Sequence, residues 1–207
     1  MKFRMVAATL AVALIPLAAR AEGDPAKAQS IVNQVCSACH GHDGNSAVPS
    51  NPSLAGQHAD YILKQLTNFK AKPGNPPERS NPVMAGMVAP LSEDDMKNLA
   101  AYFSGQKIKP RAARNPDLVK MGQSIYRAGI ASKGVPACAG CHSPNGSGIP
   151  AQFPRIAGQH PEYLVAQLKA FRAGERANDA NAMMRTTAGR LSDKEIAAVA
   201  EYLAGLR

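Results

Sequence analysis

The chain has 207 residues and a formal net charge of +9, with 24 lysines and arginines against 15 aspartates and glutamates. The basic residues neither cluster on one helical segment nor alternate with aromatic residues, which argues against a nucleic-acid partner. The charge is compatible with an acidic protein partner or an anionic membrane surface.

Residues 1–21 have the features of a secretory signal peptide. Lys2 and Arg4 give a basic start, an apolar run of 15 residues follows, and an Ala-Arg-Ala cleavage motif ends the segment. The run is broken by Pro16 and is shorter than the roughly 20 residues that a spanning helix needs, so it does not predict a membrane anchor. No later stretch is apolar enough to span a membrane. We therefore expect export to the periplasm, and loss of the leader lowers the formal charge from +9 to +6.

Residues 22–105 form the first of two predicted domains, and its helix signals begin at once. Asp24-Pro25 combines an N-cap residue with an N1 proline. The helix that it opens leads to the pentad Cys36-Ser37-Ala38-Cys39-His40. Glycine, proline, asparagine and serine follow the pentad and predict loops.

Two further helices are predicted later in this domain. Ile62, Leu66 and Phe69 repeat at the spacing of one apolar helical face. Ser92-x-x-Asp95 resembles a capping box at the start of a last helix. Because no alternating run is long enough to form a sheet, the predicted fold class is all-α.

Residues 106–115 are rich in lysine, arginine and proline and predict a linker, after which residues 116–207 repeat the first domain. The segment PSLAGQHADYILKQLTNFKA (52–71) matches PRIAGQHPEYLVAQLKAFRA (154–173) at an offset of 102. The second copy carries eight extra residues before its pentad. Its matching signals are Asn115-Pro116, the pentad Cys138-Ala139-Gly140-Cys141-His142, the apolar face Leu164, Leu168 and Phe171, and Ser192-x-x-Glu195.

The repeated pentad is the attachment signature of a c-type haem. Two thiols about one helical turn apart can add to the two vinyl groups on one porphyrin edge, and the histidine can donate its Nε2 to the iron. A large apolar cofactor would also fill the core of a domain of under 90 residues that has few aromatic side chains. We therefore predict two covalently bound haem groups.

Three other uses of the cysteines are less favoured. A disulfide within Cys-x-x-Cys closes a tiny loop and constrains little of the unfolded chain. A structural zinc site requires four ligands, whereas each copy offers three obvious ones. A thioredoxin-like redox pair requires a βαβ context, which the helical pattern does not provide.

The sixth ligand of each iron is a methionine, a second histidine or nothing. Six methionines follow the predicted leader, and only Met84 and Met184 occupy equivalent places, each seven residues before the Leu-Ser of the last helix. We select this pair as the axial ligands. His58 and His160 are also an equivalent pair and remain the rival ligands, with a capping, surface or propionate-contacting role as the alternative.

These motifs together resemble a known family. Each copy has the parts of a class I cytochrome c domain, and the tandem arrangement resembles the periplasmic dihaem cytochromes c4 over essentially the whole mature chain. The resemblance implies an all-α fold of two tandem class I domains, each wrapped around one covalent haem c. The residues it assigns are Cys36, Cys39, His40 and Met84 for the first haem, and Cys138, Cys141, His142 and Met184 for the second.

The resemblance also implies supporting residues. Pro52 and Pro154 match the proline whose carbonyl accepts the Nδ1–H of the proximal histidine and makes that ligand more basic. The residues matched to the crossing of the first and last helices are Tyr102 and Tyr202 on the last helix, and Gly122 and Tyr126 on the first helix of the second copy. The first copy departs from this pattern, because it has Ala28 and Val32 in place of the glycine and the aromatic residue.

A histidine and a methionine on both irons leave no position open to a substrate, so this ligand set predicts outer-sphere electron transfer rather than catalysis. We expect a monomeric carrier, soluble or loosely attached to a membrane. The resemblance implies transfer from a quinol-oxidising bc complex to a terminal oxidase or reductase, and exchange of electrons between the two haems of one molecule. The alternatives are the cytochrome subunit of a periplasmic dehydrogenase and a dihaem peroxidase, in which one iron would have to open.

Overall fold

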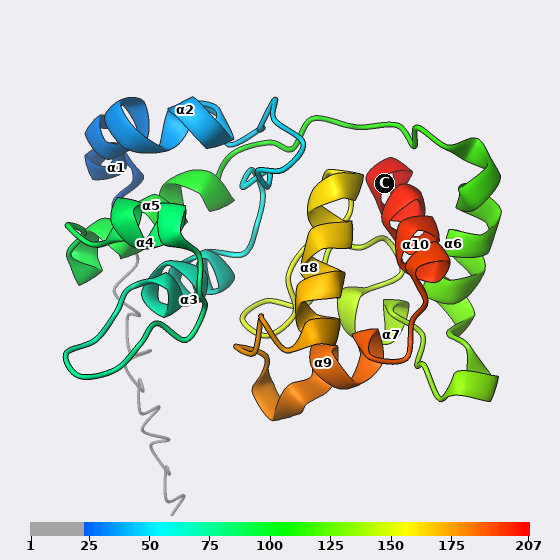
Figure 1. The fold of residues 1–207 in the computed structure, drawn as a ribbon. Coiled ribbons are helices and arrows are strands. Elements are labelled where there is room, and N and C mark those ends of the chain that lie inside the picture. The colour runs from blue at the N-terminus through cyan, green and yellow to red at the C-terminus, as the bar shows by residue number, and fades with distance from the viewer. Residues whose placement is uncertain (1–22) are drawn as a thin grey trace, which may run out of the picture.

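The computed structural model describes residues 23–207, so the signal peptide predicted for residues 1–21 lies outside the described residues. In this part of the chain the regular elements are helices, and β pairing is confined to isolated bridges. The all-α prediction is confirmed. Figure 1 shows two groups of helices, one from each half of the chain, joined by an extended segment between α5 and α6. Within residues 23–207, no helix combines the length and the apolar composition needed to cross a bilayer.

The first half, residues 23–105, contains five α-helices: α1 (Pro25–Ile31), α2 (Ser37–His40), α3 (Ala59–Phe69), α4 (Pro82–Val88) and α5 (Glu93–Ser104). The Asp24 carboxylate caps α1, and the capping box of Ser92 and Asp95 begins α5, as the sequence predicts. Helix α4 is not among the predicted elements, although Asn81-Pro82 provides the same combination of N-cap residue and N1 proline that opens α1.

The second half, residues 116–207, repeats this order: α6 (Pro116–Ala128), α7 (Ala139–His142), α8 (Pro161–Ala173), α9 (Met183–Ala188) and α10 (Asp193–Gly205). Short 3-10 turns lie at Ala131–Lys133 and Ala180–Ala182. In the first half, α1 runs through a π-helical turn, Val32–Cys36, directly into the pentad. In the second half, the extra residues form a loop closed by a bridge between Ile130 and Val135, which separates α6 from α7.

Each half encloses its own hydrophobic core. From α3, Ile62 and Phe69 are buried and Leu66 packs against the same cluster. From α8, Leu164 and Phe171 are buried in the same way. The apolar faces predicted from the sequence are therefore the faces that pack inward, and removal of this apolar surface from water stabilises each half.

The first and last helices cross closely in both halves. A Cβ atom on Gly122 of α6 would lie 2.0 Å from the carbonyl oxygen of Ala198 on α10, so only glycine fits there. Beside it, the rings of Tyr126 and Tyr202 are 5.5 Å apart. In the first half α1 packs against α5 through a core that includes the fully buried side chains of Ala28 and Val32.

The two halves are joined by a reciprocal set of hydrogen bonds. The side-chain amide of Gln57 donates to the carbonyl of Arg155 and accepts from its N–H, both at 2.9 Å. The amide of Gln159 donates to the carbonyl of Ser53 at 2.9 Å and accepts from its N–H at 2.8 Å. Because these residues are related by the repeat offset, each half contributes the same surface, as in an isologous dimer.

The predicted linker also contributes to this contact. Arg111 donates to the carbonyl of Ser46 at 2.8 Å and to Oγ of Ser53 at 2.9 Å in the first half. The same guanidinium donates to the carbonyl of Gly158 in the second half at 3.1 Å. One linker side chain thus bonds to both halves at their boundary.

Candidate functional site

Each pentad histidine is buried at the end of a short helix and is held by a proline carbonyl. His40 ends α2 and His142 ends α7, with exposed fractions of 8% and 7%. The Nδ1–H of His40 donates to the carbonyl of Pro52 at 2.8 Å, and that of His142 donates to Pro154 at 3.0 Å. A carbonyl can only accept, so the proton is on Nδ1 and the lone pair of the neutral ring is on Nε2.

Burial lowers the pKa of both histidines, and the hydrogen bonds to Pro52 and Pro154 oppose this effect only in part. Desolvation disfavours the charged imidazolium. Both rings are therefore neutral and present an Nε2 that can bind iron.

The two thiols of each pentad differ in their surroundings. Cys36 and Cys138 are half-buried and pack against the hydrophobic cores, whereas Cys39 and Cys141 are exposed. All four thiols are unpaired. Burial raises the pKa of Cys36 and of Cys138 to about 11. The first thiol of each pair thus faces the core and the second lies at the surface.

The predicted methionine ligands lie on short helices in equivalent places. Met84 is on α4, is half-buried and packs against the same core cluster as Cys36. The Asn81 side chain accepts from the N–H of Met84 at 3.0 Å and fixes the start of that helix. Met184 is half-buried on α9, whereas the neighbouring Met87 and Met183 are exposed.

The donor set of each half fits a covalently attached haem. A neutral histidine with an Nε2 lone pair, two thiols on the preceding turn and a methionine are the groups that hold such a cofactor. Within the first half, one thiol and the methionine share a single apolar cluster, which suits the apolar porphyrin.

The rival histidines have different surroundings. The His160 ring is buried, and its Nε2–H donates to the carbonyl of Ser46 in the other half at 2.9 Å. A surface role for His160 is therefore wrong: its ring fills part of the interface. His58 is half-buried, and its buried Nε2 has no hydrogen-bond partner within residues 23–207.

Sequence reasoning missed the interface glutamines. Gln57 and Gln159 stand next to the rival histidines in the identical Ala-Gly-Gln-His of the two copies. That identity was the available signal, because a loop glutamine retained at equivalent positions is placed to form the same bond twice. Which backbone it bonds to depends on how the halves dock, and the sequence of one half does not contain that information.

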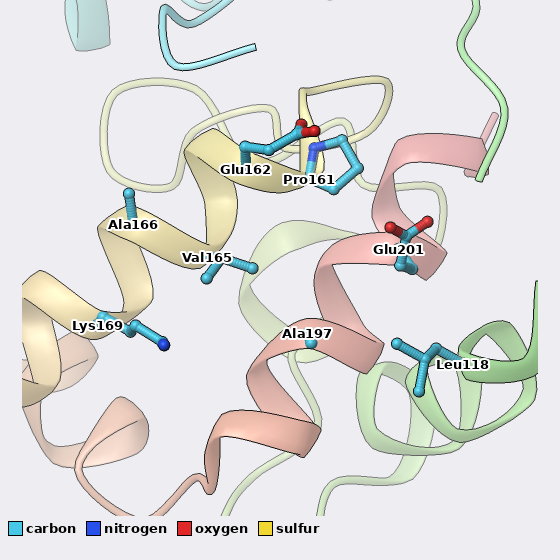
Figure 2. Close-up of a pocket in the computed structure, with 8 residues that line it drawn as sticks. All are labelled: Leu118, Pro161, Glu162, Val165, Ala166, Lys169, Ala197 and Glu201. Atoms are coloured by element: carbon cyan, nitrogen blue, oxygen red, sulfur yellow. The ribbon is translucent and has the colours of Figure 1, made fainter. Parts of the chain in front are cut away.

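A groove on the second half is separate from these donors. It has a volume of about 440 Å³ and is bounded by α6, α8 and α10. Figure 2 shows Glu162, Val165 and Lys169 along α8, Ala197 and Glu201 on α10, and Leu118 on α6 at the far side. No predicted ligand lines this groove.

Comparison with known proteins identifies the fold and the repeat. A family model described as cytochrome c matches the chain twice, over residues 25–107 and 119–207. The chain is 50% identical over 194 residues to cytochrome c4 of Azotobacter vinelandii, covering 91% of each protein. It is 39% identical over 174 residues to the thiosulfate dehydrogenase electron acceptor of Stutzerimonas stutzeri, covering 83% of this chain and 78% of that protein.

A solved structure supports the same relationship in three dimensions. The reduced recombinant cytochrome c4 from Pseudomonas stutzeri matches this structure with a TM-score of 0.82 at 44% sequence identity. The match covers 89% of this chain and all of that one, so it includes both halves and the way they pack.

Proposed function

We propose a specific role for this chain, which belongs to the cytochrome c4 family of tandem cytochromes c and carries two covalently bound haem c groups. Its general activity is that of a dihaem electron carrier. The role we propose is transfer in the periplasm from a quinol-oxidising bc complex to a terminal oxidase or reductase. The predicted leader supports the compartment, since residues 1–21 have the composition of a cleavable signal.

The equivalence of the donor sets in the two halves is the observation that carries the electron-carrier part of this proposal, while the named partners rest on the family resemblance. The proposed thioether residues are Cys36, Cys39, Cys138 and Cys141, and the proposed axial ligands are His40, Met84, His142 and Met184. Both histidines are oriented by the carbonyl of an equivalent proline.

This ligand set limits the chemistry to electron transfer. When bound, each haem supplies an iron that cycles between the ferric and ferrous states. The protein holds the histidine rings neutral and aligned, and a methionine from α4 or α9 would close the remaining position in each half. A half with both axial positions filled leaves no place for a substrate, so we propose that the chain is not an enzyme. The same argument disfavours a dihaem peroxidase.

A second candidate role is supported by one relative. The thiosulfate dehydrogenase electron acceptor of Stutzerimonas stutzeri is 39% identical to this chain over 174 residues, which cover 83% of this chain. By analogy, this protein would accept electrons directly from a periplasmic dehydrogenase, as an associated cytochrome. In both candidate roles the protein is an electron carrier, and the two roles differ only in the protein that donates the electrons.

The ligand assignment can be tested by spectroscopy of methionine variants. In the oxidised protein, methionine ligation gives a weak near-infrared sulfur-to-iron charge-transfer band, and Met84→Ala and Met184→Ala should each remove about half of it. Met87→Ala and Met183→Ala are matched controls, because these neighbouring methionines are exposed, and they should leave the band intact. A ligand variant that retains the whole band would return the assignment to His58 or His160.

The two donors can be compared by reduction kinetics. The oxidised protein is mixed with a quinol-oxidising bc complex and quinol, or with a thiosulfate dehydrogenase and thiosulfate, and haem reduction is followed by absorbance. The proposal expects rapid, saturable reduction by the first system. Saturable reduction by the dehydrogenase alone, together with co-purification of the two proteins, would replace it with the second role.

A further inference from the structure

Two methionines stand side by side at the predicted ligand position of the second half. Met183 and Met184 are the first two residues of α9, whereas the equivalent residues, on α4, are Val83 and Met84. Met183 is 40% exposed and Met184 is half-buried. The second half therefore has a spare sulfur next to the residue that we assign to its iron, and the first half has a valine in that place.

The rotation of α9 about its own axis decides which of the two sulfurs points inward. Successive side chains on an α-helix point about 100° apart, because one turn takes 3.6 residues. A rotation of α9 by this angle would bring Met183 to the place of Met184. Helix α9 has only six residues, and so short a helix is not fixed by its own hydrogen bonds. Contacts at its start must therefore set its rotation.

The contacts that begin α4 are missing from α9. In the first half the Asn81 side chain accepts from the N–H of Met84 at 3.0 Å, and Pro82 fixes the first turn. The residues in equivalent places, Asn181 and Ala182, have φ angles of 52° and 54°, and the alanine at the N-cap has no side-chain acceptor. Residues other than glycine disfavour this left-handed conformation. The backbone is therefore held against its preference by another contact.

Asp179 supplies that contact from further upstream. Its Oδ2 accepts from the backbone N–H of Arg185 at 3.0 Å, and its Oδ1 accepts from Nε of the same residue at 2.8 Å. Arg185 is the third residue of α9, where the N–H normally bonds to a capping side chain. We call the contact between Asp179 and Arg185 the α9 clamp. It closes the segment 179–185, which contains both methionines.

The α9 clamp is a buried ion pair. The side chain of Asp179 is 5% exposed and that of Arg185 is 37% exposed. Hydrogen bonds between charged groups are stronger than those between neutral groups, so the clamp holds its helix more firmly than a neutral asparagine cap would. Removal of one partner is costly, because the other charge is then left without its counter-ion.

We propose that the α9 clamp selects Met184 over Met183 as the methionine ligand of the second haem. Fixing the third residue of α9 fixes the rotation of the two residues before it, so Met184 is turned inward and Met183 toward the surface. Asp179 and Arg185 do not bind the iron and act as positioning residues. This inference rests on Met184 as a ligand, as proposed above, and not on the identity of the redox partner.

The test identifies the bound methionine by NMR of the reduced holoprotein, labelled with ¹³C in the methionine methyl groups. The porphyrin ring current shifts the methyl group of an iron-bound methionine far upfield. The unsubstituted protein should show two shifted methyl signals, from Met84 and Met184. Asp179→Ala breaks both bonds of the clamp, so intensity should move from the Met184 signal to a new shifted signal from Met183. Adding Met183→Leu, which nearly conserves volume, should abolish the new signal.

Two milder variants separate the clamp from its charges. Asp179→Asn removes a negative charge and Arg185→Gln removes a positive one, so a purely electrostatic effect would differ in sign between them. A Met183 signal in both would come from the broken clamp. Both keep a polar side chain and test the clamp even if Asp179→Ala does not fold. The matched control is Asp193→Asn, which removes an exposed carboxylate paired with Arg172 and should leave the spectrum unchanged.

A rescue experiment tests the selection directly. Met184→Leu removes the ligand sulfur but keeps the α9 clamp, so the second half should lose its shifted methyl signal and gain none. In the double variant Asp179→Asn/Met184→Leu, the helix is free to turn, and a shifted signal from Met183 should appear. A residue that only stabilised the fold would not restore methionine ligation when it is removed.

Three outcomes would overturn the proposal. A shifted Met183 signal in Met184→Leu alone would show that the clamp does not exclude this residue. Clamp variants that keep Met184 as the sole ligand of the second half, or that lose methionine ligation with no Met183 signal, would show that the clamp does not choose between the two. The absence of a shifted Met184 signal from the unsubstituted protein would overturn the ligand assignment itself, and this inference with it.

Discussion

Asn181 and Ala182 lie three and two residues before Met184, the predicted second methionine ligand, and their φ angles are 52° and 54°. Neither is glycine, and a Cβ in the left-handed region clashes with the following carbonyl. The first half reaches Met84 differently, through the side-chain cap of Asn81 and the proline at position 82. The two methionine segments are therefore equivalent in position but not in backbone strain.

Replacing the strained alanine should stabilise the second half. Ala182→Gly removes the Cβ and should raise the free energy of unfolding by up to about 1 kcal/mol, with part of the gain lost to the greater freedom of glycine in the unfolded chain. Ala180→Gly is the matched control, because Ala180 is not among the residues with positive φ, and it should be neutral or destabilising. Urea unfolding of the holoprotein measures both. Equal effects of the two substitutions would show that Ala182 is not strained.

For single residues, the sequence predicted which side chains form the site better than it predicted how deeply side chains are buried. His40 and Pro52 were matched through the resemblance, and the structure brings them to hydrogen-bonding distance. The burial of His160 was not predicted, and neither was that of Arg79 and Arg176. Both depend on contacts with the other half, and a buried charge cannot be distinguished from a surface charge by residue type alone.

The crossing of α6 and α10 is the element-level feature with the least tolerance. Gly122→Ala would place a Cβ 2.0 Å from the carbonyl oxygen of Ala198, and backbone cannot move aside as a side chain can. Overpacking typically costs about 1–3 kcal/mol and occasionally more, and a clash with backbone belongs at the upper end of this range. We expect a large fall in the unfolding free energy of the second half, measured by urea titration.

A control separates this clash from the general effect of adding a methyl group. Gly105→Ala places a Cβ at 3.6 Å from the nearest carbonyl oxygens, which is an ordinary contact, and φ there is −77°. It should change stability by less than about 1 kcal/mol. If Gly122→Ala lowered the unfolding free energy by no more than Gly105→Ala does, α6 and α10 would not cross as closely as the structure shows.

The two capping boxes were predictable, because each depends only on local sequence. Ser92 and Ser192 both form the capping boxes that their sequences indicate. The π-helical turn that leads into Cys36 was not predicted, because it has no such signature. Its counterpart in the second half is a loop, so the repeat itself gave no guidance about the shape of this connection.

At the scale of the whole molecule, the interface is what the sequence could not supply. A linker of this length can span a large distance at roughly 3.3–3.6 Å per residue, so length alone does not require the halves to touch. The structure shows polar, reciprocal contacts through Gln57 and Gln159, with Arg111 of the linker docked beside them. Such contacts leave no hydrophobic signature in the sequence.

Loss of the interface glutamines should uncouple the halves. The double variant Gln57→Ala/Gln159→Ala removes the four glutamine hydrogen bonds that cross the boundary, each contributing about 1 kcal/mol. We expect unfolding in two steps, followed by urea titration with absorbance of each haem. Gln152→Ala, an exposed glutamine, is the matched control. A single transition with an unchanged midpoint in the double variant would show that these bonds do not hold the halves together.

The central claim is that the two haems of one molecule exchange electrons across this interface. Rapid photochemical reduction of a small fraction of the oxidised protein should give a fast phase, followed by a second phase as electrons redistribute between the haems. The account predicts that the rate of the second phase is independent of protein concentration and falls in Gln57→Ala/Gln159→Ala. A second phase whose rate rises in proportion to concentration, or none at all despite unequal potentials, would contradict it and leave two independent carriers on one chain.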